Sequence, residues 1–202
     1  TARICNITFP YPIECTEVDA TVHRKVFENN KIEVWTIPLV HRIPTSGWLF
    51  REKTRPRNIL KSKIDEYLIP YPLIPGIKAG DDLVLPDDRI VPNAELTEPP
   101  PRPRSYAFCS DTAPSDDVVS VIKNVDLLYH EATFTNDHLE EARISCHTTA
   151  AQAAEIARLA GVRQLLIGHI SGRYENEEAH LAEARPIFEN THAAVEGLRV
   201  EI

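Results

Sequence analysis

The chain has 202 residues, a length typical of one domain with at most a small attachment. Hydrophobic residues make up 43% and charged residues 26%, a balance that excludes a mainly disordered chain. The net charge of −8 argues against a generally basic nucleic-acid-binding protein but allows a local basic patch. No apolar run approaches the ~18 residues that cross a bilayer. We also expect no signal peptide.

Cysteine and methionine usage bears on the compartment and on completeness. The cysteines are scattered without CxxC spacing, at Cys5, Cys15, Cys109 and Cys146. We therefore expect neither a disulfide framework nor a zinc knuckle, and we expect a cytoplasmic protein. The sequence contains no methionine, so we expect either a processed chain or a piece of a longer protein.

The first half of the chain changes character near residue 51. Up to that point, β-branched and aromatic residues between turn signals predict strands at 4–9, 20–27, 31–41 and 47–53. Residues 51–104 carry a basic run, the proline-rich stretch IPYPLIPGIKAGDD and finally EPPPRPR. We expect this segment to protrude as a long arm and return that buries little of itself, inserted within a single domain of residues 1–202.

From residue 105 onward, strand and helix patterns alternate, which predicts the second half of a layered α/β domain. We expect strands at 105–110, 125–130, 162–169 and near 198–202, and helices at 115–124, 148–159 and 177–188. Gly161 provides the stop signal of the alanine-rich middle helix.

Polar residues follow the predicted strands at corresponding positions. They are His41, Asp111, the pair His130 and Glu131, and His169. The carboxyl edge of an open α/β sheet binds ligands, and two histidines with an aspartate suit a metal such as zinc. Each residue alone has an ordinary alternative, because a histidine after a strand can be a hydrogen-bonded loop residue and an aspartate before threonine can form a turn or a helix cap.

Two further residues near this edge could take part in chemistry. His147 opens the run HTTA before the alanine-rich helix, where an imidazole can transfer a proton to an anionic substrate; alternatively, Thr148 or Thr149 caps the helix and His147 merely precedes it. Glu131 could orient a ligand or simply be a hydrogen-bonded strand-end carboxylate. The remaining histidines are expected on the solvated surface: His23, His138, His180 and His192.

The basic run at 51–63 has a local net charge of +5. Such a run can be a solvated face, but on the protruding segment of an acidic protein it indicates a contact for phosphates. Its members are Arg51, Lys53, Arg55, Arg57, Lys61 and Lys63, and none suggests base-specific recognition.

Five stretches carry a family resemblance, running in order from LVHRIPTSGWLF and YAFCSDT through LLYHEATF and CHTTAAQAA to LLIGHISGRY. They resemble ribonuclease Z, the tRNA 3′-processing endonuclease of the metallo-β-lactamase superfamily. The resemblance implies the C-terminal half to two-thirds of an αββα sandwich with a protruding arm. It also implies two zinc ions in each complete site and metal-activated hydroxide attack that removes 3′ trailers from precursor tRNA.

Carried over position by position, the resemblance implies roles for individual residues. His41 would bind the first zinc, Asp111 would bridge both ions and His169 would bind the second. His147 would be the catalytic histidine and Glu131 a supporting catalytic residue. The arm would grip tRNA, in a cytoplasmic homodimer with no membrane association.

The sequence departs from the family in lacking the HxHxDH motif, which should lie well upstream of the strand at 32–40. We expect the chain to begin after it and to hold only part of the ligand set. Two alternatives therefore remain: another metallo-β-lactamase-fold phosphodiesterase, and a non-catalytic RNA-binding fragment. The arm also lacks a clean glycine-proline repeat.

Overall fold

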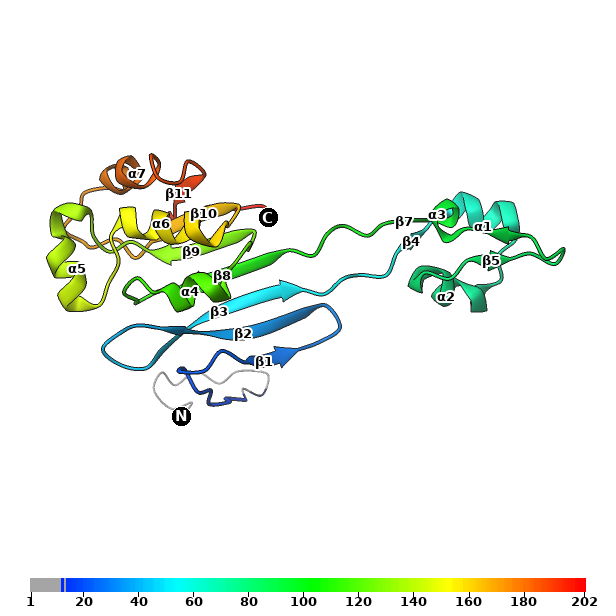
Figure 1. The fold of residues 1–202 in the computed structure, drawn as a ribbon, viewed down its shortest axis with the longest axis horizontal. Coiled ribbons are helices and arrows are strands. Elements are labelled where there is room, and N and C mark those ends of the chain that lie inside the picture. Colours follow the sequence, from blue (N-terminus) through cyan, green and yellow to red (C-terminus); the bar gives the residue numbers. More distant parts are fainter. Residues whose placement is uncertain (1–11, 13) are drawn as a thin grey trace.

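A seven-stranded sheet forms the body of the protein in the computed structural model, which describes residues 12 and 14–202 (Figure 1). The strand order is β1-β2-β3-β8-β9-β10-β11. The strands are β1 (Lys25–Glu28), β2 (Ile32–Leu39), β3 (Thr45–Glu52), β8 (Ser105–Cys109), β9 (Leu127–Glu131), β10 (Gln164–Gly168) and β11 (Thr191–Ala193). The strand predicted at 4–9 and Cys5 lie outside the described residues.

The two halves of the sheet differ in direction. Strands β1, β2, β3 and β8 pair antiparallel, whereas β8, β9, β10 and β11 pair parallel through helical crossovers. The predicted strand near 198–202 is wrong, because the last strand is β11 at Thr191–Ala193. β11 pairs with the free edge of β10. This strand has only three residues, and it is too short and too polar to show a strand pattern in the sequence.

Helices α4 (Asp116–Val121), α6 (Ala150–Ala160) and α7 (Glu178–Ala184) cover one face of the sheet. The alanines of α6 are small enough to let this helix pack closely on Leu128, Leu165 and Ile167. A capping box between Thr149 and Gln152 starts α6, and Gly161 ends it with a φ of 64°. The predictions of these three helices and of the glycine stop are confirmed.

The opposite face of the sheet is aromatic. Strand pairing aligns Phe50 with Tyr106 and Phe108 with Tyr129, and the rings stack with centroids 5.9 Å and 4.7 Å apart. Burial raises the pKa of Tyr106 to about 12. This face has the apolar character that a sandwich requires of a sheet covered by a second layer.

Residues between β3 and β8 form an arm that projects far from the sheet (Figure 1). Two extended stalk segments carry a small head, which begins and ends with the paired strands β4 (Asn58–Ile59) and β7 (Thr97–Glu98). Between these strands lie α1 (Lys61–Tyr67), η1 (Tyr71–Leu73), α2 (Ile74–Ala79), β5 (Leu83–Val84), β6 (Ile90–Val91) and α3 (Asn93–Leu96).

The expectation that the arm buries little of itself is wrong. The head has its own core, made of Ile69, Ile77, Leu83, Val91 and Leu96. Its prolines begin helices instead of breaking them, since a proline in the first helical turn gives up no hydrogen bond. The proline-rich stretch therefore folds as η1 followed by α2.

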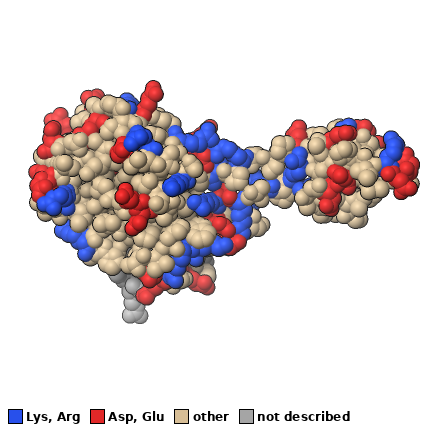
Figure 2. Space-filling view, in the orientation of Figure 1, with Lys and Arg blue, Asp and Glu red and all other residues tan. Residues whose placement is uncertain are grey.

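Ion pairs surround the base of the arm, where Figure 2 shows Lys and Arg side chains gathered beside the sheet. The guanidinium of Arg104 donates two hydrogen bonds to Glu52, of 3.0 and 2.6 Å. These bonds lower the pKa of Glu52 to about 2. Arg102 and Arg163 both pair with Asp126 at the start of β9, so the returning stalk is tied to the body.

The remaining helical segments are η2 (Asn136–His138) and α5 (Leu139–Ser145), which connect β9 to α6. Within the described part of the chain, the longest helix, α6, has 11 residues, and no helix is long and apolar enough to cross a membrane. Cys15, Cys109 and Cys146 are free thiols.

Candidate metal and catalytic site

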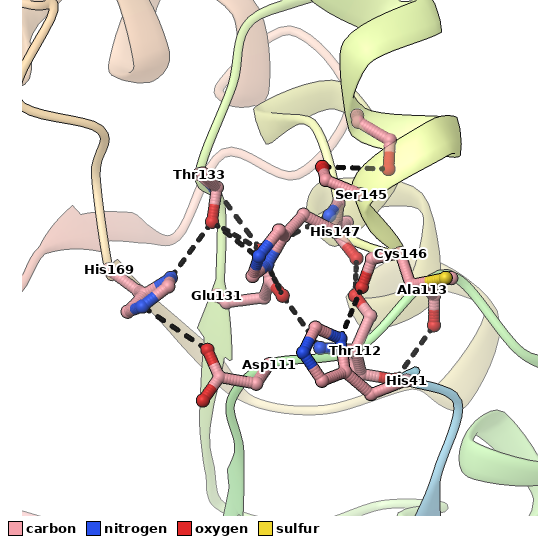
Figure 3. Close-up of polar contacts among 12 residues, drawn as sticks. His41, Asp111, Thr112, Ala113, Glu131, Thr133, Ser145, Cys146, His147 and His169 are labelled. Carbon is pink, nitrogen blue, oxygen red and sulfur yellow. Dashed lines mark hydrogen bonds and ion pairs between the residues drawn. The ribbon is translucent and has the colours of Figure 1, made fainter. Parts of the chain in front are cut away.

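Four predicted residues meet at the carboxyl edge of the parallel strands (Figure 3). Asp111 follows β8, Glu131 ends β9, His169 follows β10, and His147 precedes α6. One potential ligand atom from each lies within 4.8 Å of all the others. The chain thus brings together at one edge groups that are up to 58 residues apart in sequence.

Glu131 lies at the centre of the site and is fully buried. Its Oε1 accepts hydrogen bonds from the backbone N–H of Thr112 at 2.6 Å and from Nδ1 of His147 at 2.7 Å. Its Oε2 accepts from the hydroxyl of Thr133 at 2.7 Å and the backbone N–H of Thr148 at 3.1 Å. Since both oxygens are already occupied, Glu131 is suited to orienting its neighbours and not to binding a metal.

His147 is positioned by this carboxylate. Because a carboxylate oxygen can only accept, Nδ1 of His147 carries the proton and Nε2 remains free. His147 lies two residues before the Thr149 cap, so Glu131 and not the helix dipole dominates its surroundings. Its ring stacks on that of His169, with centroids 5.4 Å apart.

Asp111 and His169 face each other across the mouth of the site. Nε2 of His169 lies 3.2 Å from Oδ1 of Asp111, and both side chains are almost half exposed. Glycine before His169 leaves room for Tyr129, because a Cβ at Gly168 would lie 2.4 Å from the hydroxyl oxygen of Tyr129 and would displace its ring. An aspartate and an imidazole at this separation form a typical pair of ligands for a divalent cation.

His41 lies beside the four-residue group but outside it. Its Nδ1 is 3.1 Å from the backbone oxygen of Cys146, and its ring centroid is 5.2 Å from that of His147. This contact leaves Nε2 of His41 free. Its role as a metal ligand stays a prediction. His130, in contrast, points into the core and is fully buried, with Nδ1 bonded to the backbone oxygen of Glu131.

The backbone is unusual at three positions around the site. Asp111, Cys146 and His169 have φ values of 58°, 59° and 57°, in the left-handed region that side chains other than glycine rarely adopt. Such strained residues cluster at functional sites, where surrounding contacts hold them. Two of the three are candidate metal ligands, so the turns after β8 and β10 aim these side chains at the site.

The sequence interpretation missed the threonines that surround Glu131. Thr112, Thr133 and Thr148 are all buried, and each contributes a hydrogen bond to its carboxylate. A threonine beside a strand has too many ordinary roles for its sequence position alone to reveal this contact.

The six basic residues predicted to contact RNA lie on β3, the outgoing stalk and α1. Four of them are held by polar partners: Lys53 by Glu28, Arg55 by Glu52, Arg57 by Thr97 and Lys63 by Glu66. Arg51 and Lys61 are exposed and form no ion pair with any described residue. The structure thus gives Arg57 a structural contact, a 2.6 Å hydrogen bond that ties the stalk to the head.

The expectation that His180 lies on the solvated surface is wrong. The side chain is fully buried in α7 against the ring of Tyr174, and neither ring nitrogen has a hydrogen-bond partner among the described residues. Burial lowers the pKa of His180 below its usual 6.5. The surrounding charges misled the sequence interpretation, because α7 turns this position towards the core.

We expect acid to destabilise the chain through His180, because the unfolded state binds a proton below pH 6.5 that the buried imidazole resists. His180→Phe should unfold at pH 7.5 with a free energy within about 1.5 kcal/mol of wild type. Between pH 7.5 and 5.5, the free energy of unfolding of His180→Phe should fall by up to about 1.4 kcal/mol less than that of wild type. Urea unfolding at both pH values checks this, with exposed His192→Phe as control; an unchanged pH dependence in His180→Phe contradicts it.

The donor set fits a divalent cation. A neutral His169 with its proton on Nδ1 would direct the Nε2 lone pair at the Asp111 carboxylate 3.2 Å away, an arrangement that a cation between them stabilises. With Nε2 of His147 and His41 also free, the edge offers imidazole and carboxylate ligands together. The fold and this group of side chains therefore support a metal site.

Two ribonuclease Z proteins are similar to this chain in sequence. The chain is 47% identical over 193 residues to ribonuclease Z from Porphyromonas gingivalis. The match covers 96% of this chain and 64% of that protein. The chain is 46% identical over 195 residues to ribonuclease Z from Bacteroides fragilis, with the same coverage. The chain is a homologue of ribonuclease Z.

The fold is that of the metallo-β-lactamase proteins. A solved example is the metallo-β-lactamase fold protein YhfI from Bacillus subtilis, with a TM-score of 0.53 and 15% identity. The match covers 87% of this chain and 51% of that protein. No protein-family model matches the chain. The chain spans slightly less than two-thirds of the length of the ribonuclease Z relatives named above.

Proposed function

We propose that this chain is the larger part of a zinc-dependent endoribonuclease that removes 3′ trailers from precursor tRNA. The carrying observation is the convergence of Asp111, His147 and His169 around the buried Glu131, in a chain 47% identical to ribonuclease Z. Imidazole and carboxylate ligands together suit zinc. The ligands missing from this edge would come from the portion of the relatives that the chain does not span.

The residues present would have separate roles in phosphodiester cleavage. Asp111 and His169 would hold zinc, with His41 as a further ligand, and zinc would supply Lewis-acid stabilisation of charge on the phosphoryl oxygens. In its doubly protonated form, His147 would donate the Nε2 proton to the departing 3′ oxygen, while the Glu131 carboxylate accepts a hydrogen bond from Nδ1–H. The stacking of His147 on His169 keeps the proton-transferring group beside the metal ligands.

The surface of the arm is suited to binding a large RNA substrate. A groove of about 850 Å³ runs between the outgoing stalk and α2, and its lining includes Arg55, Lys78 and Tyr71. Tyr71 is 83% exposed. Cationic side chains beside an exposed aromatic ring can bind a phosphate backbone and stack on a base.

The position of the arm favours a long substrate and a second copy of the chain. The arm leaves the sheet at the end of β3 and returns at the start of β8, whereas Asp111 follows the opposite end of β8. The five residues of β8 span roughly 16 Å, and the stalk adds a comparable distance. RNA held by the head therefore reaches a catalytic site only if it is on the order of 30 Å long, or if the site belongs to the partner of a homodimer.

Replacing residues 54–102 with a two-residue turn tests the role of the arm. The paired residues Glu52 and Arg104 are close enough for a short connection. We expect the shortened chain to bind precursor tRNA at least about tenfold more weakly and with a smaller salt dependence, because the arm's phosphate contacts are gone.

Filter binding at several salt concentrations measures this, and near-UV circular dichroism controls for folding. In a protein of the relatives' full length, the same replacement should leave hydrolysis of a small phosphodiester unchanged. Equal tRNA affinity with and without the arm would contradict the proposal and favour a small-substrate phosphodiesterase.

A further inference from the structure

The hydroxyl of Thr133 touches three groups of the site at once (Figure 3). Its Oγ1 lies 2.7 Å from Oε2 of Glu131, 2.9 Å from Nδ1 of His169 and 3.3 Å from Nδ1 of His147. Thr133 is itself buried, with 7% of its surface exposed. A hydroxyl has one proton to donate and two lone pairs to accept with, so these contacts restrict where each proton lies.

The proton of Thr133 goes to Glu131. The Glu131 carboxylate already accepts the backbone N–H groups of Thr112 and Thr148, and an ionised carboxylate has no proton to give. Thr133 can therefore only accept from His169, and Nδ1 of His169 must be the donor. In the neutral ring this leaves Nε2 without a proton, and Nε2 faces Asp111 at 3.2 Å.

We propose that Thr133 is a positioning residue that holds His169 in the Nδ1–H tautomer, with Nε2 free to bind the metal. Glu131 then fixes the proton positions of both site imidazoles, that of His147 directly and that of His169 through the Thr133 hydroxyl. The assignment of a ligand role to His169 rests on the proposed function, whereas the tautomer itself is a property of the metal-free chain.

Removing the hydroxyl should change the tautomer. In Thr133→Val, Nδ1–H of His169 has no acceptor in place of Oγ1, whereas an Nε2–H could donate to Oδ1 of Asp111. We therefore expect His169 to move to the Nε2–H tautomer in this variant. Thr133→Ser keeps the hydroxyl and should restore the wild-type tautomer. Thr135→Val is the matched control, because Thr135 is equally buried but its hydroxyl contacts Tyr174 and neither site imidazole.

Histidine ring nitrogens can be observed by two-bond ¹H–¹⁵N correlation spectra of the metal-free 202-residue chain at pH 8, with His169→Gln to assign the signals. We expect Nδ1–H for His169 in wild type, Thr133→Ser and Thr135→Val, and Nε2–H in Thr133→Val. An Nε2–H tautomer in wild type overturns the proposal even if Thr133→Val does not fold. An unchanged Nδ1–H tautomer in folded Thr133→Val overturns it as well.

Zinc affinity of a protein of the relatives' full length, measured by competition with a chromophoric chelator, provides the second readout. Thr133→Val should bind zinc about 10- to 100-fold more weakly than the control variants. If wild type shows the Nδ1–H tautomer but binds no zinc, the proposed function fails and the positioning role of Thr133 stands. If all variants bind zinc equally, the role of Thr133 at the metal site is overturned while the metal site remains.

Discussion

Replacing His147 with alanine in a protein of the relatives' full length should slow precursor tRNA cleavage by about 10²- to 10⁴-fold, the usual contribution of a general acid. Metal content should stay at the wild-type level. The physical reason is that Nδ1 of His147 is held by Glu131, so only Nε2 can serve the substrate. A proton donor at that atom can be lost without removing the Asp111 and His169 pair.

Single-turnover cleavage and elemental analysis of the same preparation measure the two quantities for His147→Ala. His192→Ala is a suitable control, because His192 is exposed on β11, away from the four-residue group. An unchanged cleavage rate would remove His147 from the mechanism. A loss of metal together with activity would instead identify Nε2 of His147 as a ligand.

Replacing Asp111 with asparagine in a protein of the relatives' full length should remove both metal and cleavage. The carboxylate supplies the negative charge at the mouth of the site and lies 3.2 Å from the Nε2 of His169. Asparagine tolerates the left-handed backbone at φ 58° as aspartate does, so the substitution removes charge without adding strain. We expect zinc affinity to fall at least about 100-fold and cleavage to fall with it, because loss of an anionic ligand weakens cation binding more than loss of an outer contact.

Calorimetric titration of zinc into Asp111→Asn measures the affinity. Asp88→Asn on the arm is matched to it, since Asp88 also has a positive φ, of 63°, and is exposed. Metal binding that survives in Asp111→Asn would exclude this carboxylate as a ligand. Equal loss in both variants would point to a general electrostatic effect of the acidic chain.

Part of the site follows from local sequence. Hydrophobic runs define β8, β9 and β10, and polar residues at the end of each run mark Asp111, Glu131 and His169 as neighbours, since parallel strands share a carboxyl edge. The helix signals around α6 are equally local, because a cap and a glycine stop act on adjacent backbone groups. These features depend on short-range chemistry and can be predicted from one sequence.

Other features depend on contacts between distant segments. The charged residues around His180 in the sequence suggested a solvated side chain, yet the packing of α7 buries it. The residues of β11 show no strand pattern, and they form a strand because they pair with β10. The head of the arm folds because five spaced aliphatic side chains meet in three dimensions, which proline content conceals.

The sequence by itself determined the strands β8, β9 and β10, the residue types at their carboxyl ends and the place where the arm begins. Only the tertiary structure decided which atoms face one another. Turns with left-handed backbones and the packing of distant segments bring Glu131 to His147, 16 residues away in sequence, and Thr133 to His169, 36 residues away. Hydrogen-bond direction depends on positions within a few tenths of an ångström, and the chain sets those positions only when its core is packed.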